Sequence, residues 1–308
     1  MICFPFVSRF YVLLILAASL IPNTVQAEQW GSLVTADQLA QTVDSKVPCR
    51  ILDLGPKKSA YLEGHIPGSV YVDWIRDITA LTKSERYNLP PRKQFEELMS
   101  RCGITPKTHI FLYDDLDNRI SVRMFWTLRY FGHPHIHILD GGKRAWQKGG
   151  HPLQRNVIRI PPTDYRCPGE NRSLTASADF IFSNLNQSGL WLIDGRPLKQ
   201  YTGEDAGKVY HTGKPHSKRG HIPGARHLFW KDNLEADGTF KSKEELKRMY
   251  AKFLQQQNRE IVTYCNEGLH AAVPWFVLSE LLDRKNVKVY DDSMCEWANS
   301  NRPTERAK

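Results

Sequence analysis

The sequence lacks an apolar run long enough to span a bilayer comfortably. The best candidate, residues 11–21, is short, follows a lone charge at Arg9 and precedes the cleavage pattern Val25-Gln26-Ala27. This arrangement predicts an export signal over residues 1–27, a periplasmic or secreted location, and no membrane association after cleavage. A retained membrane anchor is the alternative. No lipoprotein-type cysteine follows the apolar core, because Cys3 precedes it.

Cysteine is scarce, and the basic residues form no long stripe. The formal net charge is +9, with basic residues scattered apart from residues 214–219. This distribution favours solubility and small anions as ligands, and it predicts no nucleic-acid partner. An odd number of cysteines beyond residue 27 leaves at least one thiol unpaired in an exported chain. Disulfides and packed free thiols both remain open for the others. These cysteines are Cys49, Cys102, Cys167, Cys265 and Cys295.

Metal-binding patterns are also weak. The histidines within residues 133–137 alternate as they enter a predicted strand, and two or three on one face can bind a metal, but no further ligands lie nearby. The acidic residues within 114–117 lack the glycine and glutamate of a calcium loop. We therefore predict neither a metal nor a cofactor.

The sequence does contain an internal repeat. Gly64-His65-Ile66-Pro67-Gly68 recurs at residues 220–224, and a set of four residues recurs at a single offset of 151. A period of that length indicates a domain duplication. The upstream offsets differ, so the second copy holds an insertion, residues 203–219. The four repeated residues are Tyr113, Asp140, Trp146 and Pro152, which recur as Tyr264, Asp291, Trp297 and Pro303.

Helical and apolar segments alternate in the same order in both copies. The predicted helices 35–43 and 175–185 precede the predicted strands 50–54 and 190–194, and later strands follow at 137–139 and 287–290. Alternation of this kind predicts two tandem α/β domains, each a mostly parallel sheet flanked by helices.

A stretch rich in proline, arginine and polar residues, 155–173, separates the copies and is the predicted linker. The predicted domains are therefore residues 28–154 and 174–308.

The second copy places Cys265 between a strand and a helix. Residues 261–264 form a β-branched apolar run, and residues 273–282 carry apolar side chains at helical spacing. Backbone N–H groups at such a corner have no partners and bind anions, so we expect them to lower the pKa of the thiol. The first copy has Asp114 at this position, among three acids in four residues. We expect no anion cradle there and no activity.

The residue six positions after the cysteine is Ala271, where a cysteine-dependent phosphatase needs arginine, so phosphoryl chemistry is disfavoured. The Cys-x-x-Gly-x-x-Ala loop after a Val-Thr-Tyr strand resembles the active-site loop of the rhodanese family. The resemblance extends through residues 275–282 and 289–297, and it is to exported, two-domain thiosulfate sulfurtransferases. It implies tandem rhodanese-like domains whose amino-terminal half is inactive, with aspartate in place of the cysteine.

The resemblance implies transfer of the outer sulfur of thiosulfate through a persulfide on Cys265. The partners would be a small anionic sulfur donor and an acceptor, which is cyanide, a thiol or a protein dithiol, and we expect a monomer. Arg196, in an Asp-x-Arg motif, would contact the anionic end of the donor, with a surface ion pair as the alternative. The predicted donor-binding residues are Arg196, Asn266, Glu267, Gly268, Leu269, His270, Ala271 and Asp73.

Glu267 departs from the pattern of the exported subgroup, in which threonine is more usual at this position. Asp73 stands where, in the mercaptopyruvate branch, an aspartate of the inactive domain reaches a loop hydroxyl, but the third loop residue here is Glu267. 3-Mercaptopyruvate is therefore the alternative donor, and a non-catalytic exported thiol or binding scaffold is the alternative role. A carboxylate opposes an anionic donor, so we expect Glu267 to turn outward, toward a basic residue of 203–219. Most of those basic residues are expected to lie in a solvated loop, and one or two to reach the mouth and steer anions. His270 is expected at the rim, in contact with donor or acceptor, with a solvated side chain as the alternative.

Overall fold

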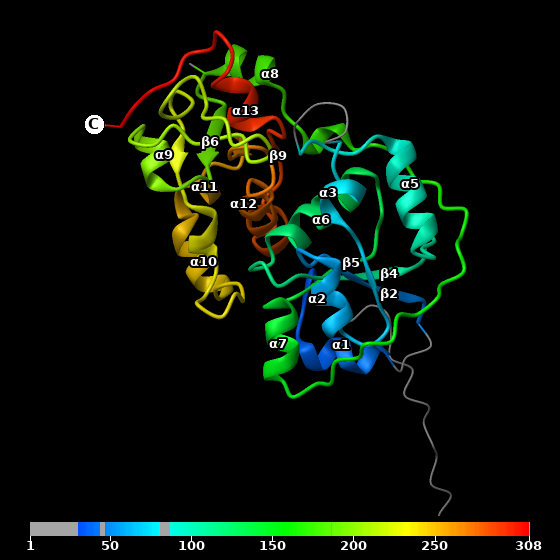
Figure 1. The fold of residues 1–308 in the computed structure, drawn as a ribbon. Coiled ribbons are helices and arrows are strands. Elements are labelled where there is room, and N and C mark those ends of the chain that lie inside the picture. The colour runs from blue at the N-terminus through cyan, green and yellow to red at the C-terminus, as the bar shows by residue number, and fades with distance from the viewer. Residues whose placement is uncertain (1–29, 44–46, 81–86, 186, 308) are drawn as a thin grey trace, which may run out of the picture.

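The computed structural model describes residues 30–43, 47–80, 87–185 and 187–307, and these residues form two α/β units in tandem (Figure 1). The predicted export signal lies outside the described residues. Within the described ranges, no helix is long and apolar enough to cross a membrane.

The first unit is built on a parallel sheet with the strand order β1-β5-β4-β2-β3. Its described strands are β1 (Leu33–Val34), β2 (Cys49–Asp53), β3 (Ser69–Tyr71), β4 (His109–Tyr113) and β5 (Ile136–Leu139). The described helices are α1 (Ala36–Val43), α2 (Lys58–Glu63), α3 (Trp74–Asp77), α5 (Arg92–Arg101), α6 (Arg119–Tyr130) and α7 (Gly142–Lys148). Strand β4 is buried along its whole length, as expected for a central parallel strand.

The second unit repeats this plan with a parallel sheet in the order β7-β6-β8-β9. Its strands are β6 (Leu190–Asp194), β7 (Arg226–His227), β8 (Glu260–Tyr264) and β9 (Val287–Val289). The helical segments are η2 (Arg172–Leu174), α8 (Ala178–Asn184), α9 (Leu198–Thr202), η3 (Trp230–Asn233), α10 (Lys243–Met249), α11 (Ala251–Leu254), α12 (Ala272–Phe276), η4 (Val277–Leu281) and α13 (Ser293–Trp297). The predicted architecture, two mostly parallel sheets each flanked by helices, is confirmed.

The duplication extends to individual hydrogen bonds. The phenol of Tyr113 accepts a bond from the N–H of Ile66 at 3.2 Å, and that of Tyr264 accepts one from Ile222 at 3.1 Å. Each Gly-His-Ile-Pro-Gly histidine stacks on a tyrosine and bonds to its carbonyl, which gives both histidines a structural role. The pairs are His65 with Tyr61 and His221 with Tyr201.

Helices α6 and α12 join the two units through one hydrophobic core. The ring of Phe125 meets Phe276 edge-on at 5.0 Å between centroids, and Phe240 packs on Phe276 at 5.3 Å. Burying one such side chain stabilises the fold by about 2–3 kcal/mol. Helix α12 follows the Cys265 loop, and α6 follows the equivalent loop of the first unit, which begins at Asp114. The packing of the two helices therefore places both loops at the boundary between the units.

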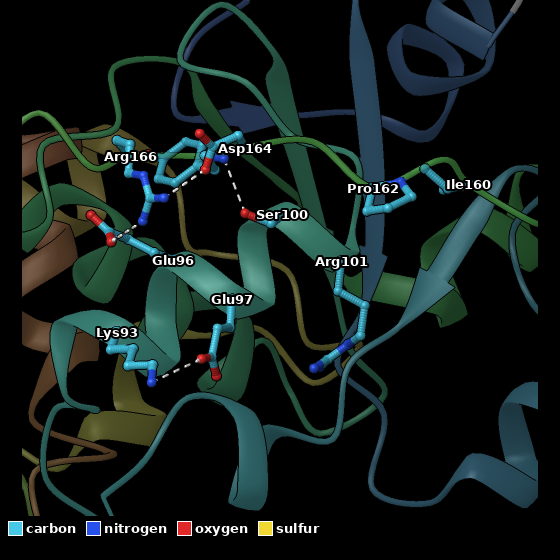
Figure 2. A pocket seen from close by; sticks show the side chains of 10 residues that line it. Lys93, Glu96, Glu97, Ser100, Arg101, Ile160, Pro162, Asp164 and Arg166 are labelled. Carbon is cyan, nitrogen blue, oxygen red and sulfur yellow. Dashed lines mark hydrogen bonds and ion pairs between the residues drawn. The ribbon is translucent and has the colours of Figure 1, made fainter.

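The predicted linker packs against the first unit. No helix or strand lies in residues 155–171, and Tyr165 is buried, with its N–H donating to the hydroxyl of Ser100 at 3.0 Å. Figure 2 shows a pocket between α5 and residues 160–166, with charged side chains around it. None of the residues that line this pocket belongs to the Cys265 loop.

Candidate active site

Cys265 follows β8 directly, and the loop of residues 265–271 leads into α12. The side chain of Cys265 is 1% exposed. Four backbone N–H groups of the loop lie close enough to its sulfur to favour a negative charge there, so the anion cradle predicted from the strand-to-helix corner is present. They belong to Glu267, Gly268, His270 and Ala271.

The expected lowering of the thiol pKa is wrong. Burial raises the pKa of Cys265 above its ordinary value, and the four amides only oppose that rise. Complete burial removes the water that hydrates a thiolate, and the amides replace this hydration in part. The resting residue is therefore a thiol near neutral pH.

Glycine and serine fix the shape of the loop. Gly268 adopts a φ of +78°, and a Cβ there would lie 2.4 Å from the carbonyl oxygen of Asp291. The hydroxyl of Ser293 accepts bonds from the N–H groups of Cys265 at 3.0 Å and Gly268 at 3.1 Å, and it donates to the carbonyl of Tyr290 at 2.7 Å. The loop is thus held in shape by the chain around it.

The first unit supports the same loop from the other side. Arg123, on α6 and fully buried, donates to Asp291 Oδ1 at 2.5 Å and to the carbonyl of Gly268 at 3.4 Å. The second carboxylate oxygen of Asp291 accepts the N–H of Leu89 at 2.8 Å. Breaking one partner of a buried pair of this kind costs about 3–5 kcal/mol, so the two units hold the loop jointly.

The equivalent loop of the first unit does form a cradle, contrary to expectation, but Asp114 fills it. The buried carboxylate accepts N–H bonds from Leu116 at 2.8 Å, Asn118 at 3.0 Å, Ile120 at 3.0 Å and Ser121 at 2.8 Å. The hydroxyl of Ser121 donates as well, at 2.9 Å. The acids therefore do not prevent a cradle. The first unit has no thiol at this position, and its own side chain occupies the anion site.

Arg196 lies in a buried ion pair rather than the surface pair considered as the alternative. Its guanidinium binds Asp194 with bonds of 2.7–3.2 Å and donates to the carbonyl of Gly220 at 2.8 Å. Burial opposes the positive charge, but Asp194 and, more weakly, Tyr264 and Cys265 favour it, so the pKa of Arg196 is raised. Its Nη1 is buried and has no hydrogen-bond partner among the described residues. That donor is available to an anion near the thiol.

The expectation that Glu267 turns outward is wrong. Its side chain is 2% exposed, and Oε2 accepts the backbone N–H of Tyr210 at 2.9 Å. The carboxylate does face the insertion, but it meets a backbone amide instead of a basic side chain. Oε1 is buried without a partner among the described residues. Burial raises the pKa of Glu267 to about 7, and the bond from Tyr210 opposes this rise.

The insertion covers the loop mainly with neutral groups. His216 Nε2 lies 3.1 Å from Asn266 Oδ1, and the amide nitrogen of Asn266 donates to Gln200 at 2.9 Å. Asn266 is therefore occupied by protein partners. Lys218 donates to the carbonyls of Ser300 and Arg302. Of the basic residues in 203–219, His216 alone forms a side-chain hydrogen bond to the loop within the described part of the chain, and burial lowers its pKa.

Aromatic side chains surround His270 at the rim. Its imidazole stacks on Trp230 at 4.8 Å between centroids and meets the ring of Tyr210 edge-on at 6.1 Å. Burial among these rings, together with the charge of Arg119, lowers the pKa of His270 to about 3, so the imidazole is neutral. His270 is partly exposed, as expected for a rim residue.

The structure does not bring Asp73 to the loop. Asp73 caps α3, where its carboxylate accepts the N–H of Arg76 at 3.3 Å, and it lines a separate pocket of the first unit. Leu269 is 7% exposed, and Ala271 accepts the hydroxyl of Thr263 at 2.8 Å through its carbonyl. Leu269 therefore packs, while Ala271 contributes its backbone.

The other cysteines and histidines have local roles. None of the five described cysteines forms a disulfide. His133 bonds to Tyr165 and to the carbonyl of Thr108, whereas His137 bonds to His109. Among the described residues, no group of three or more histidine, cysteine or acidic side chains is placed to hold a metal.

Sequence reasoning missed several residues of the site. Ser293 and Arg123 contact the loop from distant segments, and no motif marks them. Tyr210 lies within the insertion, and Trp230 lies a few residues beyond it. Comparing the two copies reveals the insertion, but it does not indicate that these aromatic side chains lie at the site. Gln200 follows the Asp-x-Arg motif by four residues and is also nearly buried.

A thiol in an amide cradle at the end of a parallel strand defines a cysteine-dependent group-transfer site on a duplicated α/β fold. A model of the rhodanese-like domain matches residues 35–149 and 179–300, so the chain belongs to the rhodanese family of sulfurtransferases. It is 33% identical over 271 residues to the "Sulfur carrier protein TtuD" of Thermus thermophilus, covering 87% of this chain and 93% of that one.

Two further relatives share most of the chain. A Mycolicibacterium smegmatis protein named "Putative thiosulfate sulfurtransferase" is 33% identical over 239 residues, which is 78% of this chain and 84% of that one. The crystal structure of SseA from Escherichia coli, described as a 3-mercaptopyruvate sulfotransferase, has a TM-score of 0.73 and 27% identity. That similarity covers 85% of this chain and 98% of SseA.

The free donor of Arg196 gives a first prediction. Arg196→Lys keeps the positive charge beside Asp194 but loses Nη1, so the apparent KM for thiosulfate should rise about fivefold, as for loss of one charge-assisted hydrogen bond. Discharge of preformed persulfide should change less than twofold. Rapid-mixing experiments on each half-reaction measure the thiosulfate dependence of sulfur loading and the rate of persulfide discharge. Equal slowing of the two would assign Arg196 a purely structural role.

Proposed function

We propose that the protein is a thiosulfate sulfurtransferase that works through a persulfide on Cys265. The observation that carries this proposal is the convergence of four backbone N–H groups on one buried thiol. Such a cradle stabilises a negative charge on sulfur, whether on the thiolate or on the terminal atom of a persulfide. Nη1 of Arg196, which has no hydrogen-bond partner within the described part of the chain, supplies a cationic donor nearby.

In the first half-reaction the Cys265 thiol loses its proton to solvent, and the thiolate attacks the outer sulfur of thiosulfate. A new sulfur–sulfur bond forms as the bond to the sulfonate sulfur breaks. The bonding pair leaves on sulfite, a dianion, and the enzyme keeps one negative charge on the persulfide. The amides of the cradle stabilise that negative charge, and so they favour formation of the persulfide.

In the second half-reaction an acceptor attacks the outer sulfur of the persulfide. Cyanide yields thiocyanate, and a thiolate yields a new persulfide. In each case the bonding pair returns to Cys265 as a thiolate, so neither an oxidant nor a reductant is needed. A protein dithiol is a further acceptor of the same chemical class.

The site favours thiosulfate over 3-mercaptopyruvate as the donor. Glu267 supplies no hydroxyl in the loop, and Asp73 bonds within its own helix cap. The name of the Mycolicibacterium relative points the same way, whereas the likeness to SseA keeps mercaptopyruvate as the second donor to test. We also propose that residues 1–27 direct export, because their charge, apolar core and cleavage pattern match a signal segment.

Intact-mass analysis of the purified protein after incubation with thiosulfate tests this function. One added sulfur atom should appear and should disappear when cyanide or a small thiol is added. The same analysis with 3-mercaptopyruvate should show slower loading. No added sulfur from either donor would leave a non-catalytic thiol scaffold as the better description.

A further inference from the structure

Helix α6 of the inactive unit brings a second arginine to the active-site mouth. Arg119 is the first residue of α6 and precedes Arg123 by four positions. Residues four apart lie on one face of a helix, about 6 Å apart along its axis. Because Arg123 donates to Gly268 and Asp291, this face of α6 is the one that meets the Cys265 loop.

Two contacts made by the residues just before α6 hold the start of this helix against the second unit. The carboxylate of Asp117 accepts Lys231 Nζ at 2.8 Å, and the amide of Asn118 donates to the carbonyl of Gly238 at 3.2 Å. Arg119 follows these two residues directly and is half-buried. Its backbone position is therefore fixed relative to the catalytic unit.

The charge of Arg119 reaches the rim of the site. After burial, it is the cause that lowers the pKa of His270. Burial raises the pKa of Tyr210, and the charge of Cys265 adds to this, whereas Arg119 opposes it. Both rings stand over the loop, one stacked on Trp230 and the other at the edge of the imidazole.

Arg119 differs from its neighbours on α6 in having no ion-pair or side-chain hydrogen-bond partner within the described part of the chain. Arg123 pairs with Asp291, and Arg129 pairs with Glu280 at 3.1 Å. A half-buried guanidinium with no such partner among the described residues, whose charge acts on His270 and Tyr210, is a cation that an anion can approach.

We propose that Arg119 binds the charged end of the sulfur donor, so that the donor site is completed by the catalytically inactive unit. In-line attack on the outer sulfur requires the leaving sulfonate to point away from the Cys265 thiolate, which is outward from the cradle. Arg119 stands one helical turn before Arg123, and its charge acts on His270 and Tyr210 at the rim of the site. This inference rests on the proposed function and adds the class of ligand that the mouth selects, a sulfur donor that carries two negative charges.

Steady-state kinetics with two donors test the role of Arg119. Thiosulfate carries two negative charges, and methanethiosulfonate carries one because a methyl group replaces an oxyanion oxygen. Arg119→Gln should raise the KM for thiosulfate about tenfold and that for methanethiosulfonate about threefold, because a Coulomb interaction scales with charge. Arg119→Lys should stay within about threefold of wild type for thiosulfate. Discharge of preformed persulfide to cyanide, which carries a single charge, should slow by no more than about threefold in Arg119→Gln.

The matched control is Lys93→Gln, which removes an exposed positive charge from α5 of the same unit, beside the pocket of Figure 2. It should leave both KM values unchanged. An equal shift for both donors, or a wild-type KM in Arg119→Gln, overturns the role of Arg119 while leaving sulfur loading intact. Failure of wild-type protein to gain sulfur from either donor overturns the proposed function instead, so the two failures are distinct.

Discussion

Cys265→Ser should abolish persulfide formation, with thiosulfate turnover below about a thousandth of wild type. A serine hydroxyl is not ionised near neutral pH and cannot carry a sulfane sulfur as cysteine does. The added sulfur expected for wild type in intact-mass analysis should be absent from the variant. A variant that still gains sulfur at the wild-type rate would place the chemistry on another thiol.

The fold of this variant should survive. The backbone N–H of Cys265 bonds to Ser293, and its carbonyl accepts the N–H of Met294, so neither contact involves the sulfur. The matched control is Cys295→Ser. Cys295 is also buried, and its N–H bonds to the carbonyl of Asn266, beside the reactive residue in space. It should retain sulfur loading, which separates loss of the nucleophile from loss of a nearby buried thiol.

Those parts of the fold that depend on local pattern could be predicted from the sequence. The apolar run ending at Cys265 and the helical spacing beyond it place the thiol at a strand-to-helix corner, and the structure has β8 and α12 there. The repeat of Tyr113 as Tyr264 corresponds to equivalent hydrogen bonds in the two units. Buried parallel strands and tight turns have strong local signatures, so these predictions needed no knowledge of long-range contacts.

The orientation of individual side chains could not be predicted in the same way. Asp114 was expected to prevent a cradle, but its side chain is long enough to curl back and accept the amides itself. Arg119 reaches the mouth only because α6 packs on α12, a contact between segments about 150 residues apart in the chain. Glu267 turns inward because the insertion offers the N–H of Tyr210. Contacts of this kind depend on tertiary packing, which one sequence does not specify by pattern alone.

Glu267→Gln should stabilise the protein more at high pH than at low pH. The side chain is buried, and its pKa of about 7 exceeds the ordinary value of 4.5. Below pH 4.5 the carboxyl is protonated in both the folded and unfolded states, and it has no pH-linked cost. Between pH 4.5 and 7 the unfolded chain ionises first, so stability falls as pH rises, by about 3 kcal/mol in total. Glutamine does not titrate and escapes this loss.

Scanning calorimetry at pH 4.5 and pH 8 measures this difference. The Tm of Glu267→Gln minus the Tm of wild type should be about 6–12 °C larger at pH 8 than at pH 4.5. Any fixed cost of the substitution cancels in that comparison. The matched control is Glu97→Gln, at an exposed position on α5, which should show no such widening. A constant difference in Tm would mean that water reaches the Glu267 carboxylate in solution.

The same variant should load sulfur faster above pH 7. An ionised carboxylate roughly 7 Å from the sulfur, in an effective dielectric of about 20, opposes a unit negative charge by about 2 kcal/mol. Glu267→Gln should therefore gain about thirtyfold in loading rate at pH 8 and little at pH 5.5, where wild type is protonated. Because burial raises the pKa of Cys265, the variant's rate should rise up to tenfold per pH unit, whereas the wild-type rate should flatten above pH 7. Loss of activity at pH 8 would instead show that the Glu267 carboxylate takes part in the reaction, for example by accepting a proton from an incoming thiol.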